Sequence, residues 1–154
     1  DAPPDEVVGL GSGADSAMLR RKQDVVAAAL QRWASSRHDP DDHIALLAAL
    51  GGPEFALLCG VVTGVSSVGG IVVLDGAATT VAAAVAARAD PVVCSHLVAG
   101  QRSNEVVHVR LLAQLGLEPL LDLRLRAGEG LGAVMATRLV LDSLEVRRRT
   151  VTTE

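Results

Sequence analysis

The sequence has very few aromatic residues. Trp33 and Phe55 are the only two among 154 residues, and tyrosine is absent. Proteins that bind single-stranded nucleic acid usually stack the bases on aromatic side chains and surround the strand with positive charge. The net charge of this chain is −4, so it meets neither requirement. The composition therefore argues against nucleic-acid binding.

The sequence also has only two cysteines. It lacks long uninterrupted apolar runs and a segment that resembles a leader peptide. Cys59 and Cys94 both lie in apolar surroundings, which favours buried, reduced thiols over a disulfide. The first residues, DAPPDEVV, lack the basic-then-apolar order of a secretory signal peptide. Glycine, aspartate or arginine interrupts each apolar run, so we expect no membrane span. These features predict a cytoplasmic protein.

Small and aliphatic residues are plentiful, and their pattern predicts the fold class. Apolar residues make up 49% of the chain and charged residues 21%, which is typical of one globular domain, here residues 1–154. Short apolar runs alternate with segments of helical periodicity, which predicts an α/β fold with a parallel sheet. We expect strands at 6–8, 71–74, 91–98 and 120–125, and helices at 15–35, 43–50, 53–62, 79–88, 103–115 and 131–147.

Three segments that follow predicted strands contain glycine or a carboxylate. In an open α/β sheet, ligands bind beyond the carboxyl ends of the strands, so we expect these segments to converge on one site. They are GLGSG at 9–13, which includes Gly11, Ser12 and Gly13; Asp75-Gly76; and Gly128-Glu129-Gly130.

Glu129 is the strongest candidate for a chemical role. At the start of a helix its carboxylate can simply complement the helix dipole. That interpretation does not explain the glycines on both sides of it, which allow close approach to a ligand. A carboxylate in that position can also accept a proton from a nitrogen heterocycle as a general base.

The other candidates each have a structural alternative. The 9–13 loop can offer backbone N–H groups to an anion, or it can be an ordinary tight turn. Lys22 can reach a phosphate from the following helix, or it can be a solvated surface residue. Asp75 can accept hydrogen bonds from sugar hydroxyls, or it can end its strand in an Asp-Gly turn. The four histidines show no spacing typical of a metal site.

Several motifs, taken in order, resemble one enzyme family. The resemblance extends from Val7 to about Leu144, and its most specific part is LGLEPLLDL followed by RAGEGLGA. The chain is similar to the nicotinate-nucleotide–dimethylbenzimidazole phosphoribosyltransferases of cobalamin lower-ligand synthesis. The motifs that carry the resemblance are VVGLGSGADSAMLRRK, LAALGGPEFALLCG, VVLDG, AGQRSNEVVH, LGLEPLLDL and RAGEGLGA.

This resemblance implies a Rossmann-like, three-layer fold with a parallel sheet and flanking helices, usually in a homodimer. It implies transfer of phosphoribose from nicotinate mononucleotide to 5,6-dimethylbenzimidazole, without a cofactor or a metal. Glu129 matches the family's general base. Residues that match its phosphate and ribose contacts are Gly11, Ser12, Gly13, Lys22, Asp75 and Ser103, with Gly128 and Gly130 beside the base.

The chain also departs from the family pattern. Gln101 stands where histidine is frequent, and NEVVH at 104–108 replaces a more usual AEPGH. Ala127, Leu131 and Arg124 also differ from the common residues around the GEG motif. These changes suggest a pocket that accepts a different base or reacts slowly.

Members of the family are longer than this chain, which resembles their C-terminal portion and represents an incomplete version of the fold. Half of a parallel sheet leaves a strand edge that must be covered. We therefore expect a homodimer or pairing with an N-terminal half. Two alternatives stay open, namely a catalytically silent nucleotide-binding or assembly domain and a purely structural half.

Overall fold

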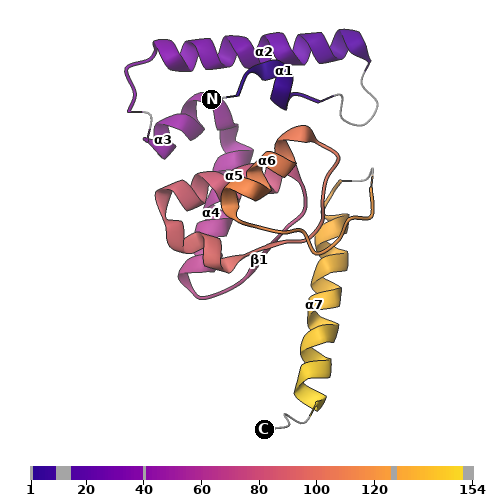
Figure 1. The fold of residues 1–154 in the computed structure, drawn as a ribbon. Helices are drawn as coiled ribbons and strands as arrows, with labels where there is room; N and C mark the ends of the chain where they lie inside the picture. Colours follow the sequence, from indigo (N-terminus) through magenta and orange to yellow (C-terminus); the bar gives the residue numbers. More distant parts are fainter. Residues whose placement is uncertain (1, 10–14, 40, 126–127, 151–154) are drawn as a thin grey trace.

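The computed structural model describes residues 2–9, 15–39, 41–125 and 128–150 (Figure 1). Within these residues, helices predominate over strands. The elements are α1 (Pro4–Val7), α2 (Ser16–Ser35), α3 (His43–Leu46), the π-helical η1 (Leu47–Gly51), α4 (Gly52–Ser67), β1 (Val72–Leu74), α5 (Ala77–Ala89), the 3₁₀-helical η2 (Pro91–His96), β2 (Leu97–Ala99), α6 (Val106–Leu115) and α7 (Leu131–Arg149).

The sheet is small and parallel. Strands β1 and β2 pair in parallel, with Val72 opposite Leu97 and Val73 opposite Val98. The chain just after β2 extends the sheet, because Gln101 forms a parallel bridge to Leu121. Three chain segments therefore run side by side, each followed by a helix. The prediction of an incomplete α/β fold with a parallel sheet is confirmed.

The core lies between α4, α5 and the strands. Helix α5 is the most buried helix, because its alanines let neighbouring elements approach closely; Ala82 and Ala83 are both 0% exposed. This confirms the helix predicted at 79–88. The core cluster consists of Val62, Leu74, Ala83, Ala86, Ala87, Val93 and Leu97.

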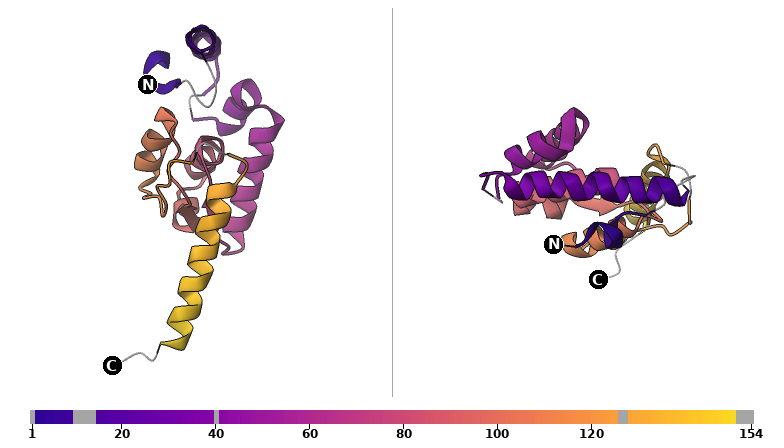
Figure 2. Two further views of the ribbon diagram at one scale, coloured as in Figure 1. Left: turned by 90° about the vertical axis from the view of Figure 1, so that its right-hand side faces the viewer. Right: turned by 90° about the horizontal axis from the view of Figure 1, so that it is seen from above.

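Two helices extend beyond this core. Helix α2 lies across one end of the molecule, and α7 projects from the other end (Figures 1 and 2). No residue of α2 is buried. In α7 only Gly132 and Ala136, near the start of the helix, are buried. The first turns of α7 are therefore the part that packs against the body.

The expected strand at 6–8 is wrong. Glu6 and Val7 belong to the short helix α1, and Val8 is its C-cap; the helix has proline at its start and Asp5 and Glu6 in its first turn. Proline fits the first turn of a helix, and acidic side chains there complement the helix dipole. The sequence interpretation required the glycine loop at 9–13 to follow a strand, but the loop follows a helix.

The expected break between two helices at Gly51-Gly52 is present in the backbone, because Gly52 has a φ of +74° and a ψ of 174°, outside the helical region. Helical segments nevertheless follow one another directly from His43 to Ser67, over 25 residues. The π-helical turn η1 accommodates the glycines, and Pro53 lies in the first turn of α4, where it needs no intrahelical hydrogen bond.

The His43–Ser67 segment, which is helical on both sides of Gly52, corrects our expectation about apolar runs. Its most apolar 18-residue window has a mean hydropathy of 1.9 and is 6% buried, so by length and composition it can cross a membrane. A single helix of this kind is weak evidence for a membrane span, because core helices of soluble proteins pass the same test. The sequence-based prediction of no membrane partner therefore stays a prediction.

The two other expected strands are shorter than predicted. Pro91 to His96 form a 3₁₀ helix, because Asp90 accepts a hydrogen bond from the Val92 N–H (3.0 Å) and Pro91 provides no donor. Only Leu97–Ala99 is strand. In the expected 120–125 strand, the bridge at Leu121 is the pairing that the described residues show.

Candidate functional site

Two loops that follow neighbouring strands meet at one edge of the sheet. A Cβ placed on Gly76, after β1, would lie 3.8 Å from Cβ of Ser103, after β2. The Thr79 hydroxyl oxygen accepts hydrogen bonds from the N–H groups of Asp75 (3.0 Å) and Gly76 (3.2 Å), which fixes the first loop. The Asp75-Gly76 segment, one of the three expected to converge, therefore lies beside the loop that carries Ser103.

A buried histidine connects these two loops. His108 is 1% exposed, and its Nδ1 accepts a hydrogen bond from the Ser103 N–H at 3.0 Å. The ring proton is therefore on Nε2, which donates to the Thr80 hydroxyl at 3.1 Å. That hydroxyl in turn donates to the carbonyl oxygen of Gly76 at 2.8 Å. The neutral imidazole thus holds both strand-end loops together.

The protonation state of His108 should influence stability. Burial lowers the pKa of the His108 imidazole below the usual histidine value, and the nearby Asp75 carboxylate partly opposes the shift. The unfolded chain therefore binds a proton more readily than the folded chain. We expect the free energy of unfolding to fall as the pH is lowered below about 6.5, and urea denaturation between about pH 7.5 and 5 will measure this fall.

The variant that tests this prediction is His108→Gln, because glutamine keeps an amide donor near Thr80 but does not titrate. We expect the variant to lose part of the pH dependence, while His43→Gln, which replaces a part-exposed histidine at the start of α3, should keep all of it. Equal slopes for His108→Gln and the unchanged protein would show that His108 does not cause the acid sensitivity.

Asp75 lies at the end of β1 and is largely enclosed, with 8% exposure. Its Oδ1 accepts hydrogen bonds from the backbone N–H of Ala133 (3.0 Å) and from Nε2 of Gln101 (3.2 Å). Asp75 therefore brings the start of α7 against the ends of both strands. The third predicted segment, Gly128-Glu129-Gly130, directly precedes that helix.

Glu129 is exposed and has an unusual backbone conformation. Its φ angle is +64°, and Arg124 is the other described non-glycine residue with a positive φ, at +51°. For a residue with a Cβ this region costs roughly 1–2 kcal/mol. Strain of this kind tends to occur at functional sites, where the fold holds a side chain in a required position.

The structure places the remaining predicted residues as follows. Ser103 is half-buried, and its Oγ accepts a hydrogen bond from the Glu105 N–H at 3.1 Å. Lys22 is exposed on α2, away from the Asp75 contacts, in a shallow cavity of about 490 Å³ that Val8 and Met18 also line. Gly128 is exposed, and Gly130 has a φ of +82°. Gly11, Ser12 and Gly13 lie outside the described residues.

The glycine loop nevertheless begins close to the strand-end loops. A Cβ placed on Gly9 would lie 3.9 Å from Cγ2 of Val106, the first residue of α6. Glu6 of α1 also forms an ion pair with Arg110 of α6, at 2.7 Å. The segment before the loop is therefore held against the helix that follows Ser103.

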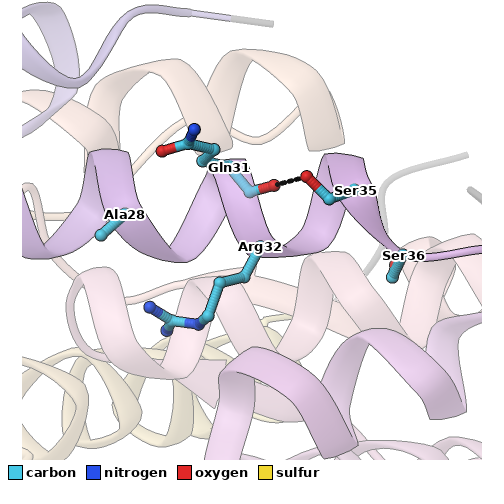
Figure 3. A pocket seen from close by; sticks show the side chains of 5 residues that line it. All are labelled: Ala28, Gln31, Arg32, Ser35 and Ser36. Carbon is cyan, nitrogen blue, oxygen red and sulfur yellow. Dashed lines mark hydrogen bonds between the residues drawn. The ribbon is translucent and has the colours of Figure 1, made fainter.

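A second shallow cavity, of about 460 Å³, lies along the C-terminal half of α2 (Figure 3). Ser35 Oγ donates to the Gln31 carbonyl oxygen there at 2.8 Å. Neither cavity is lined by Asp75, Ser103 or Glu129. The residues that line the second cavity are Ala28, Gln31, Arg32, Ser35 and Ser36.

No metal site is apparent in the described part of the chain, where no three His, Cys, Asp or Glu side chains gather as metal ligands would. The structural roles of His108 and Gln101 are not among those predicted from the sequence. For His108, a signal was available, because its position on a predicted helix places it on the face that holds Leu112. For Gln101, no pattern in the sequence distinguishes a buried amide from an exposed one.

The protein belongs to the α/β class, because its strands are parallel, a helix follows each strand and the strand-end loops meet at one edge. In proteins of this class, ligands bind beyond the strand ends. A family model described as phosphoribosyltransferase matches residues 1–154. The chain belongs to this phosphoribosyltransferase family.

Similar proteins share one name. The chain is 44% identical over 141 residues to a nicotinate-nucleotide–dimethylbenzimidazole phosphoribosyltransferase of Mesorhizobium japonicum, and the match covers 92% of this chain and 41% of the relative. The protein of the same name from Salinispora tropica is 41% identical over 154 residues, covering 99% of this chain and 41% of the relative.

A solved structure agrees with these relatives. CobT from Thermus thermophilus superimposes with a TM-score of 0.84 at 40% identity, covering 92% of this chain and 41% of that one. The chain therefore has the fold of the matching part of CobT. It spans about two-fifths of the length of the relatives that it matches.

Proposed function

We propose that the chain forms part of an enzyme that transfers phosphoribose from nicotinate mononucleotide to 5,6-dimethylbenzimidazole, in the cytoplasm. The family membership and the names of the relatives support this reaction. Glu129 is the proposed catalytic residue. The other proposed substrate contacts are Gly11, Ser12, Gly13, Lys22, Ser103, Gly128 and Gly130.

The proposed reaction requires little covalent chemistry from the protein. A nitrogen of the benzimidazole attacks C1′ of the ribose while the C1′–N bond to the pyridinium ring breaks, and nicotinate leaves with the bonding electrons. The attacking base carries an N–H proton that becomes acidic as the new bond forms, and the Glu129 carboxylate accepts it. Positioning the two substrates supplies much of the acceleration, and the general base contributes typically about 10²–10⁴-fold.

The strongest support for this role is the position of Glu129, which precedes Gly130, the N-cap of α7. The third residue of α7, Ala133, donates its N–H to the Asp75 carboxylate at the end of β1. Asp75 is not among our proposed ligand contacts, because two donors within the fold already occupy its Oδ1. Ser103 and Gly76 lie against each other at the same sheet edge, so a ligand bound there can contact both loops.

The test is an assay of nicotinate release. The chain is incubated with nicotinate mononucleotide and dimethylbenzimidazole, both alone and together with the N-terminal portion of the Mesorhizobium relative. We expect nicotinate and the benzimidazole ribotide to appear in equal amounts, and no nicotinate to appear without the base. Absence of turnover and of nicotinate mononucleotide binding in both preparations would refute the proposal.

We further propose that the apolar surfaces of α4 and α7 are covered in the working enzyme by polypeptide equivalent to the rest of the family's length, or by a second copy of the chain. Leu57 on α4 is 69% exposed, and Val134 and Leu141 on α7 are 67% and 54% exposed. Within the described residues, β1 pairs only with β2, so its other edge is open to a further strand. Light scattering after size exclusion, with and without the N-terminal portion, distinguishes the two arrangements.

A catalytically silent nucleotide-binding domain is the second candidate. The exposure of Glu129 and the location of both cavities along α2 favour it. Calorimetry decides between the candidates, because binding of nicotinate mononucleotide without any nicotinate release in the completed protein would support the silent domain.

A further inference from the structure

Helix α7 begins without a capping side chain of its own. Its N-cap residue is Gly130, which makes no side-chain hydrogen bond, and the first N–H groups of a helix have no acceptor within the helix. Such groups usually bind a Ser, Thr, Asp or Asn side chain at the N-cap. Here the N–H of Ala133, the third residue of α7, donates instead to Oδ1 of Asp75, 58 residues earlier in the chain.

Gln101 completes this contact from the end of β2. Its side chain is 3% exposed, and its Nε2 donates to the same Asp75 oxygen at 3.2 Å. The side chain lies against Gly132, where an added Cβ would overlap Cγ and Cδ of Gln101. Gly100 allows an equally close approach, since a Cβ there would lie 2.7 Å from the Leu74 carbonyl oxygen and 3.1 Å from Cα of Ala133.

The side-chain amide of Gln101 has an unfavourable feature as well as a favourable hydrogen bond. Its Oε1 is buried and is the one side-chain atom of the described residues that is both buried and without a hydrogen-bond partner. A buried acceptor without a partner is destabilising, so an apolar side chain would fill the space better. The hydrogen bond from Nε2 to Asp75 is the interaction that requires glutamine here.

We propose that Asp75 and Gln101 are positioning residues that fix the first turn of α7 and thereby place the Glu129 carboxylate. The proposal rests on the proposed function, in which Glu129 is the base. Glu129 directly precedes Gly130, so a displacement of the first turn of α7 moves Glu129 with it. A general base must reach its proton within hydrogen-bond distance, and a misplacement of about 1 Å costs on the order of 10²-fold in rate.

The kinetic test uses Asp75→Ala, Asp75→Asn and Gln101→Leu in the completed enzyme. We expect Asp75→Ala to lower kcat by about 10²-fold while KM for nicotinate mononucleotide changes less than about threefold. Asparagine is an equally good capping acceptor, so Asp75→Asn should recover most of kcat. Gln101→Leu should lower kcat in the same sense. A rise in KM with kcat preserved would instead make Asp75 a direct ligand of the ribose and overturn the proposal.

A structural test separates this proposal from the proposed function, because it needs no substrate. We expect amide hydrogen exchange of Ala133 in the 154-residue chain to become faster in Asp75→Ala and to return towards the original rate in Asp75→Asn. Asp42→Ala is the matched control, since Asp42 caps α3 through the Ala45 N–H at 2.9 Å and should leave α7 unchanged. If amide exchange of Ala133 is unchanged in Asp75→Ala, the positioning role is overturned. If exchange becomes faster but none of the proteins shows turnover, only the proposed function is refuted.

Discussion

Glu129→Gln is expected to lower the rate of nicotinate release by about 10²–10⁴-fold in the completed enzyme, with little change in the affinity for nicotinate mononucleotide. Glutamine has nearly the same shape as glutamate but cannot accept the proton that the attacking base loses. The measurement is steady-state release of nicotinate, combined with calorimetric binding of nicotinate mononucleotide to both proteins.

The backbone at Glu129 provides a second, independent variant. Because its φ is +64°, Glu129→Gly should relieve backbone strain and raise the free energy of unfolding by up to about 1 kcal/mol, while turnover is lost as in the glutamine variant. Glu118→Gln is the control, since Glu118 lies before the described bridge at Leu121 and has no proposed chemical role. Equal rates for Glu129→Gln and the unchanged enzyme would eliminate Glu129 as the base.

Gly132→Ala is expected to destabilise the fold by about 1–3 kcal/mol, which is typical of an extra methyl group in a filled core. The added Cβ would overlap the Gln101 side chain and lie 2.7 Å from its Nε2. Gln101 is buried and bound to Asp75, so it can move away only by giving up that hydrogen bond. Urea denaturation measures the loss, and turnover should fall with it because the start of α7 shifts.

Three further variants make this result specific. Gly60→Ala and Gly64→Ala on α4 have no atom within 4 Å of the added Cβ and should be neutral or stabilising, because alanine favours helix by up to about 1 kcal/mol over glycine. The double variant Gly132→Ala with Gln101→Ala should be more stable than additivity of the two single changes predicts, since the contact between the two side chains is gone. Strict additivity would show that the loss of stability in Gly132→Ala does not come from the contact with Gln101.

The sequence predicts those parts of the fold that depend on local patterns. The helices labelled α2, α5, α6 and α7 lie near their expected positions, because their apolar residues recur at helical intervals. By residue type, either Asp15 or Ser16 can cap α2, and the Asp15 side chain accepts the Met18 N–H at 2.8 Å. The run of β-branched residues before Asp75 predicts a strand, and β1 is that strand.

Other elements depend on effects that local patterns do not show. Short apolar segments are ambiguous, so the sequence favours a strand at 6–8 although Pro3 and Pro4 suit a helix start. At the glycine pair Gly51-Gly52 the local pattern predicts a helix end, and Gly52 leaves the helical region there with a φ of +74° and a ψ of 174°. The local pattern does not show that the following helix, expected at 53–62, continues to Ser67.

The candidate site can be predicted as a meeting of segments, but not in its internal connections. The expectation that the 9–13 loop, Asp75-Gly76 and the Glu129 loop approach one sheet edge comes from the general property of parallel sheets. The contacts of Gln101 with Gly132, and of His108 with Thr80, join residues that are far apart in the chain. A single sequence has no signal for such pairs, because each residue alone is compatible with many neighbours.

The distant cap of α7 has a consequence for how the protein folds. The Ala133 N–H and its acceptor on Asp75 are 58 residues apart, so closing this contact requires ordering a long intervening loop. Local helices such as α5 form without that entropic cost, and long-range contacts slow the later steps. We therefore expect the loop that carries Glu129 to be among the last segments to reach its native place, after both strands have paired.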